Sequence, residues 1–157
     1  MSTNIIDELA SYSKAEKNYS EELMKLANEI RHPVLKTLFE SIAKDSDKHG
    51  MIYASICELL TTTQPFITEN EYRAIANVID RHIKMEEEML KAANRIFSSV
   101  DDPRVKLLIA AIREDEAKHH ALLIAIKNNI ARKEVLREED FWDLVWRESP
   151  WHGAPGG

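Results

Sequence analysis

The chain has 157 residues, of which 44% are hydrophobic and 31% charged, and its formal net charge is −6. This length suits one domain with a single substantial core. The acidic balance argues against a nucleic-acid partner, which requires clustered Lys and Arg. No apolar run resembles a membrane span or the core of a signal peptide, so we expect a cytoplasmic protein without a membrane partner. The single cysteine, Cys57, excludes an internal disulfide and a cysteine-ligated iron or zinc module in this chain.

Four long segments carry apolar residues at spacings of three and four, which is typical of amphipathic helices. The first covers residues 5–30, and the second begins at Pro33, a residue favoured in the first helical turn. A third helix is predicted to start near Thr68, which can form a capping box with Glu71. The fourth is predicted to begin at Pro103, with Asp101 or Asp102 as its N-cap. The sequence therefore predicts an all-α protein.

The two halves of the chain resemble each other at an offset of 70 residues. Aligning Pro33–Ile56 with Pro103–Ile126 gives eight identities in 24 positions. Because a helical hairpin cannot bury its own apolar stripes, two hairpins are expected to pack together. We predict a four-helix bundle built from two duplicated hairpins over residues 1–132. Residues 133–157 are predicted to form a short C-terminal helix and a tail that holds all three tryptophans.

Polar residues interrupt each apolar stripe at positions that should face the core. Buried ions are costly unless they are paired or bound to a metal. His120 lies about 100° around the helix from His119, so we expect it at the surface. The repeat places the inward polar residues at matching depth: Glu16 with Glu86, Ser46 with Glu116, and His49 with His119.

This combination of side chains suits first-row metal ions. Carboxylates can bridge two metals while imidazoles bind their outer faces, and an E-x-x-H pair puts both ligand types on one helical face. Glu116-Ala-Lys-His119 is such a pair. We therefore predict a metal centre, with a metal-free buried polar network as the alternative. Its ligands are predicted to be Glu16, His49, Glu86, Glu116 and His119.

Three stretches resemble the ferritin-like, rubrerythrin-type di-iron carboxylate proteins: AEKNYSE from Ala15, HPVLKTLFESIA from His32, and IREDEAKH from Ile112. The resemblance covers residues 5–130. It implies an up-down bundle that binds two iron ions, with manganese or zinc as other metals, and that reacts with oxygen or peroxide. It also implies that the five predicted ligands match the ligand positions of the family.

One position departs from this pattern, because the first half reads Ser46-Asp-Lys-His49 where the family has E-x-x-H. Two divalent ions carry four positive charges, and the three remaining carboxylates cancel only three of them. The second metal is then held weakly, or Asp45, His82 or water replaces the missing ligand, or one metal remains on the second half. His82, one turn from Glu86, is better placed for this than Asp45.

Two functions follow from these patterns. The first is a rubrerythrin-like oxidoreductase, a peroxidase or ferroxidase, that receives electrons from an external donor protein because the chain lacks a cysteine-ligated iron module. The alternative is a metal-poor or mono-metal bundle with a structural or partner-binding role.

The segment between the second and third predicted helices bears on assembly. If a two-fold axis relates the halves so that these helices run parallel, their connection must return along the bundle. Residues 61–69 span only about 30 Å when extended. Either the helix ends unwind, or the chain exchanges hairpins with a second copy. We expect a homodimer, which forms by domain swapping if the hairpins are exchanged.

Overall fold

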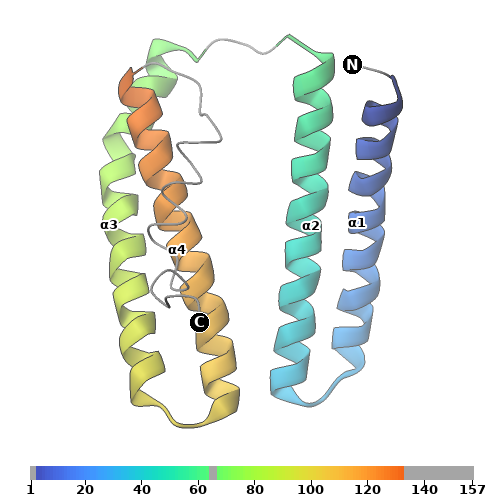
Figure 1. The fold of residues 1–157 in the computed structure, drawn as a ribbon, viewed down its shortest axis with the longest axis vertical. Coiled ribbons are helices and arrows are strands. Elements are labelled where there is room, and N and C mark those ends of the chain that lie inside the picture. Colours follow the sequence, from blue (N-terminus) through green and yellow to red (C-terminus); the bar gives the residue numbers. More distant parts are fainter. Residues whose placement is uncertain (1–2, 64–66, 133–157) are drawn as a thin grey trace, which may run out of the picture. The chain divides into compact units, whose positions relative to one another are not determined.

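The computed structural model describes residues 3–63 and 67–132, which form four helices and, within these ranges, no strand (Figure 1). The prediction of an all-α chain is confirmed. The predicted C-terminal helix and tail lie outside the described residues. No helix in the described ranges is long and apolar enough to cross a membrane. The helices are α1 (Thr3–Glu29), α2 (Pro33–Thr61), α3 (Glu69–Ser99) and α4 (Pro103–Arg132).

The helices pair as two hairpins, α1 with α2 and α3 with α4 (Figure 1). Each hairpin belongs to a compact unit of its own, and the boundary between the units lies at Ile67. A short turn joins the two helices of each hairpin, at residues 30–32 in the first and 100–102 in the second. The two hairpins are described separately below.

Local sequence signals set the helix starts as predicted. Thr68 Oγ1 accepts a hydrogen bond from Glu71 N–H at 3.3 Å, and Thr68 N–H donates to Glu71 Oε2 at 2.7 Å, which completes the capping box of α3. At α4, Asp102 Oδ1 accepts from Arg104 N–H at 2.9 Å, while the Asp102 carbonyl accepts from Lys106 N–H at 3.0 Å. Asp102 is therefore the N-cap, which resolves the choice between the two aspartates.

Small residues bring α1 and α2 close together. Ala27 and Ala43 are fully buried, and Ser13 Oγ donates to the Gly50 carbonyl at 2.8 Å. A Cβ atom placed on Gly50 would lie 3.1 Å from the Ser13 carbonyl oxygen, so the absence of a side chain there permits this approach.

The α3·α4 hairpin uses different side chains at the equivalent positions. Phe97 and Arg113 stand 70 residues after Ala27 and Ala43. The Arg113 guanidinium lies 4.3 Å from the centre of the Phe97 ring, and its Nε donates to Asn94 Oδ1 at 2.7 Å. A cation–π contact thus stands in this hairpin where the first hairpin has two small buried residues. Near the other end, Ala117, Ala121 and Ala125 of α4 are buried.

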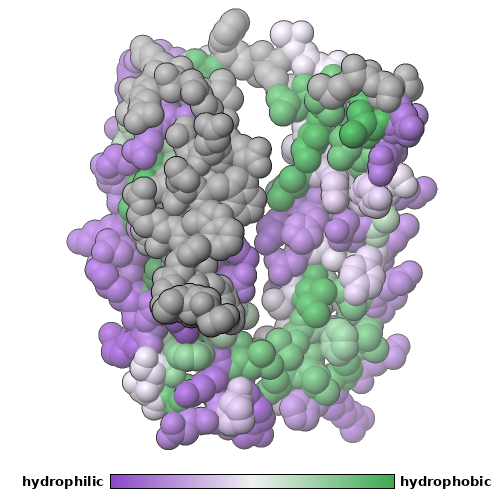
Figure 2. Space-filling view, in the orientation of Figure 1, coloured by the Kyte–Doolittle hydropathy of each residue, from purple (hydrophilic) through white to green (hydrophobic). Residues whose placement is uncertain are grey.

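Each hairpin also leaves an apolar face exposed. Ile42 and its repeat partner Ile112 are both 46% exposed. On the α1·α2 hairpin, Figure 2 shows apolar side chains toward both ends and hydrophilic ones between them. Several other exposed apolar residues form pairs at the 70-residue offset: Tyr19 with Met89, Leu26 with Ile96, Leu35 with Val105, and Ile52 with Leu122.

Candidate metal centre

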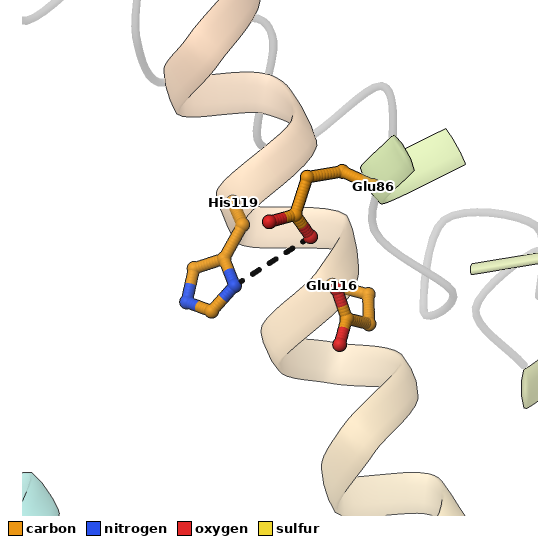
Figure 3. Close-up of side chains that lie close together, drawn as sticks. All are labelled: Glu86, Glu116 and His119. Carbon is orange, nitrogen blue, oxygen red and sulfur yellow. Dashed lines mark ion pairs between the residues drawn. The ribbon is translucent and has the colours of Figure 1, made fainter. Parts of the chain in front are cut away.

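Three predicted ligands converge in the α3·α4 hairpin. Glu86 of α3 points toward α4, where Glu116 and His119 lie one turn apart on a common face (Figure 3). Each residue offers one ligand atom, and these atoms all lie within 4.8 Å of one another. His119 Nδ1 is 3.7 Å from Glu86 Oε2. Two carboxylate oxygens and one imidazole nitrogen form a donor set suited to a first-row divalent ion.

The two carboxyl groups of this cluster destabilise each other when both are ionised. Within the described residues, no hydrogen-bond donor reaches the buried atoms Glu86 Oε2 and Glu116 Oε2. Hydrogen bonding to Glu86, burial and the Glu86 charge together raise the pKa of Glu116 to about 7, and the nearby His119 opposes this increase. A protonated Glu116 can donate to Glu86, and a bound cation would supply the same compensation for both groups.

The other two predicted ligands form a matching pair in the α1·α2 hairpin. His49 Nδ1 lies 3.7 Å from Glu16 Oε1, the same separation as between His119 and Glu86. At the position equivalent to Glu116 stands Ser46, which is only 5% exposed. Over residues 3–63 and 67–132, the α3·α4 cluster is the one place where three such ligands gather. The first hairpin therefore has counterparts of Glu86 and His119 but none of Glu116.

Two adjoining hollows open beside the Glu16–His49 pair. One, of about 320 Å³, is lined by this pair, Ile52 and Tyr53. The second, of about 350 Å³, shares Glu16 and His49. The rings of Tyr12 and Tyr53 stack at a centroid distance of 5.7 Å. The other residues that line the second hollow are Tyr12, Ala15, Tyr19 and Ser46.

The two proposed substitutes for the missing glutamate are Asp45 and His82. Asp45 pairs with Lys48, whose Nζ is 2.7 Å from Asp45 Oδ1. His82 is exposed and is not part of the α3·α4 cluster. Neither residue joins a group of three ligands within the described part of the chain.

The prediction that His120 lies at the surface is wrong, because this residue is only 8% exposed. Its neighbours Ala117 and Ala121 are small and buried, so the contact between α4 and α3 extends around to the face that carries His120. Its charge acts on Glu87 of α3, whose pKa is lowered mainly by Lys91 and to a smaller extent by His120. The repeat offered a signal for this position, since His120 is the counterpart of Gly50, where α1 and α2 approach closely.

Comparison of the chain with protein-family models, with curated proteins and with solved structures finds no match.

Proposed function

We propose that this chain is a cytoplasmic non-haem metal protein of rubrerythrin type, with oxidoreductase or ferroxidase activity toward peroxide or oxygen. The convergence of Glu86, Glu116 and His119 on one point carries this proposal. It agrees with the resemblance in sequence, since the same three residues match ligand positions of that family. Glu16 and His49 are proposed to take part in a second, weaker metal site.

The residues of the α3·α4 cluster have distinct tasks. Glu86 and Glu116 neutralise a divalent cation, and Glu116 must release its proton for this because its pKa is near 7. The side chain of His119 is 56% exposed, which leaves the cluster accessible to small molecules. Iron bound there would supply the redox chemistry with oxygen or peroxide. Electrons would come from an external donor protein.

A second candidate function is a bundle that holds one metal ion for structural purposes. Ser46 favours it, because this buried residue offers no carboxylate beside Glu16 and His49. The two candidates differ in redox chemistry: a structural site binds its metal without consuming an oxidant.

The test combines metal binding with oxidant consumption. Full-length protein is loaded with Fe(II) without oxygen, its metal content is measured, and hydrogen peroxide is then added. We expect at least one tightly bound iron per chain and peroxide loss coupled to iron oxidation. Glu116→Gln is expected to weaken iron binding about 10- to 100-fold, at least as much as the loss of a residue that supports a ligand.

Glu114→Gln is the matched control, because Glu114 lies on the same helix but pairs with Lys118 at 2.9 Å. It should bind iron as the unaltered chain does. Equal iron binding by both variants would contradict a metal site on Glu116. Tight binding without peroxide consumption would support the structural alternative.

A further inference from the structure

We propose that the hollow beside Ser46 binds a small exogenous carboxylate, which completes a second metal site on Glu16 and His49. This inference rests on the proposed metal-binding function and deepens it, since it assigns a ligand class to the first hairpin. Three observations support it: the repeat geometry, the charge of the half-site and the space beside Ser46.

The repeat identifies the group that is missing. In both hairpins a glutamate oxygen lies 3.7 Å from a histidine Nδ1, so two of the three ligand positions are arranged alike. In the α3·α4 hairpin the third position is occupied by the carboxylate of Glu116. Its counterpart, Ser46, has a hydroxyl group, which is a poor ligand unless ionised. What the first hairpin lacks is therefore one carboxylate.

The charge of the half-site favours an anion. A divalent cation on Glu86, Glu116 and a neutral His119 is balanced by two carboxylates. The same cation on Glu16 and a neutral His49 is balanced by one, which leaves one positive charge. A monocarboxylate such as acetate or formate would cancel this charge and supply the hard oxygen donor that such ions prefer.

The hollow has room for this ligand in the right place. Ser46, Glu16 and His49 line the same hollow of about 350 Å³, which exceeds the space that an acetate ion requires. Asp45, the acidic substitute on α2, is engaged with Lys48 at 2.7 Å. Tyr12 and Tyr19 line the same hollow, and their hydroxyl groups provide hydrogen-bond donors suited to a carboxylate.

The experiment measures Co²⁺ binding to the full-length chain by equilibrium dialysis, in buffer free of carboxylates and with acetate or chloride at equal ionic strength. With chloride we expect one tightly bound ion per chain. With acetate we expect a second ion, bound about 10- to 100-fold more tightly than with chloride, the range typical of adding a supporting interaction to a metal site. The visible spectrum of Co²⁺ should change as the second ion binds.

Two substitutions of Ser46 separate the missing carboxylate from general effects of mutation. Ser46→Glu supplies the carboxylate from the chain, so the second ion should bind without acetate and the acetate response should disappear. Ser46→Ala keeps the hollow and should respond to acetate as the unaltered chain does. His49→Ala should abolish the acetate-dependent ion and leave the first ion in place. Circular dichroism checks that each variant is folded.

A reciprocal variant tests the repeat argument. Glu116→Ser makes the second hairpin resemble the first, so its tight ion should become dependent on acetate. Equal binding of the second ion with chloride and acetate, or no second ion in either, would overturn the carboxylate proposal while leaving the proposed function intact. Failure to bind even the first ion would overturn both.

Discussion

At the scale of single residues, the raised pKa of Glu116 predicts that the stability of the fold depends on pH. The pKa of Glu116 is about 7 in the folded chain, above its ordinary value of 4.5, so folding favours the protonated form. Its contribution to stability is therefore fully present below pH 4.5 and is lost as the pH rises through 7. The metal-free chain should lose stability between pH 5 and 8, while metal binding should strengthen over that range.

Glu116→Gln should flatten this decline, because glutamine keeps the shape of the carboxylic acid and does not ionise. We expect its melting temperature at pH 8 to exceed that of the unaltered metal-free chain by about 2–4 °C, the shift typical of 1 kcal/mol in a chain of this size. Thermal melts of both proteins at several pH values, with a chelator present, measure it. The exposed Glu114→Gln should leave the pH dependence unchanged, and equal slopes for all three proteins would contradict the prediction.

Gly50 illustrates a second constraint at this scale. In an exposed helix, replacing glycine by alanine stabilises by about 1 kcal/mol. Here the new Cβ would lie 3.1 Å from the Ser13 carbonyl oxygen, and such overpacking costs about 1–3 kcal/mol. Gly50→Ala should therefore lower the free energy of unfolding by up to about 2 kcal/mol, measured by urea denaturation. A gain of about 1 kcal/mol would show that α1 can move aside at no cost.

At the scale of helices, sequence signals predicted the starts well because they act within a few residues. Pro33, the Thr68–Glu71 box and the Asp102–Pro103 start are local interactions, and the structure confirms each of them. Positions that depend on how closely two helices approach were harder to predict. His120 was placed on the wrong face because a helical wheel does not show how far the contact with α3 extends.

The candidate site was likewise predictable only in part. The repeat predicted that Glu86, Glu116 and His119 would face inward at the same depth, and they lie together. The sequence did not reveal the hollow beside Ser46, because its shape depends on where the rings of Tyr12 and Tyr19 lie. That the predicted ligands bind a metal ion remains a prediction.

The cation–π contact between Phe97 and Arg113 has no counterpart at the equivalent alanines of the first hairpin, and its contribution to stability can be measured. We expect Phe97→Leu to lower the free energy of unfolding by about 0.5–1 kcal/mol through loss of the cation–π contact, beyond any change in packing. A double-mutant cycle with Arg113→Gln, followed by urea denaturation, isolates that contribution. Additive effects of the two substitutions would show that ring and guanidinium do not interact. Lys106 Nζ lies over the same ring at 5.4 Å, so a second cycle with Lys106→Gln measures its smaller share of the cation–π contact.

At the scale of the whole molecule, the exposed apolar faces bear on assembly. Ile42, Ile112 and their neighbours repeat along each hairpin, and exposed apolar faces of this kind mark surfaces that associate. We expect a homodimer in solution, measured by sedimentation equilibrium. Ile42→Lys together with Ile112→Lys should shift the chain toward the monomer, whereas Glu8→Lys with Glu88→Lys, at exposed polar positions, should not.

The length of the connection between α2 and α3 tests whether such a dimer forms by exchange of hairpins. Residues 62–68 span at most about 25 Å, whereas a helix of 29 residues such as α2 is about 43 Å long. A connection that had to return along α2 would therefore be too short, and a hairpin from a second copy removes this need. Inserting about twelve Gly and Ser residues after Thr62 adds about 40 Å of reach and should convert an exchanged dimer into a monomer.

The same insertion after residue 135, outside the repeat, should leave the dimer unchanged and so controls for the added length. A dimer that persists with the longer connection would mean that complete chains associate without exchange. A chain that is monomeric before any insertion would instead contradict the homodimer itself. The short connection limits only the route back along α2. The experiment therefore distinguishes a dimer that forms because this segment is too short from one that forms because the apolar faces associate.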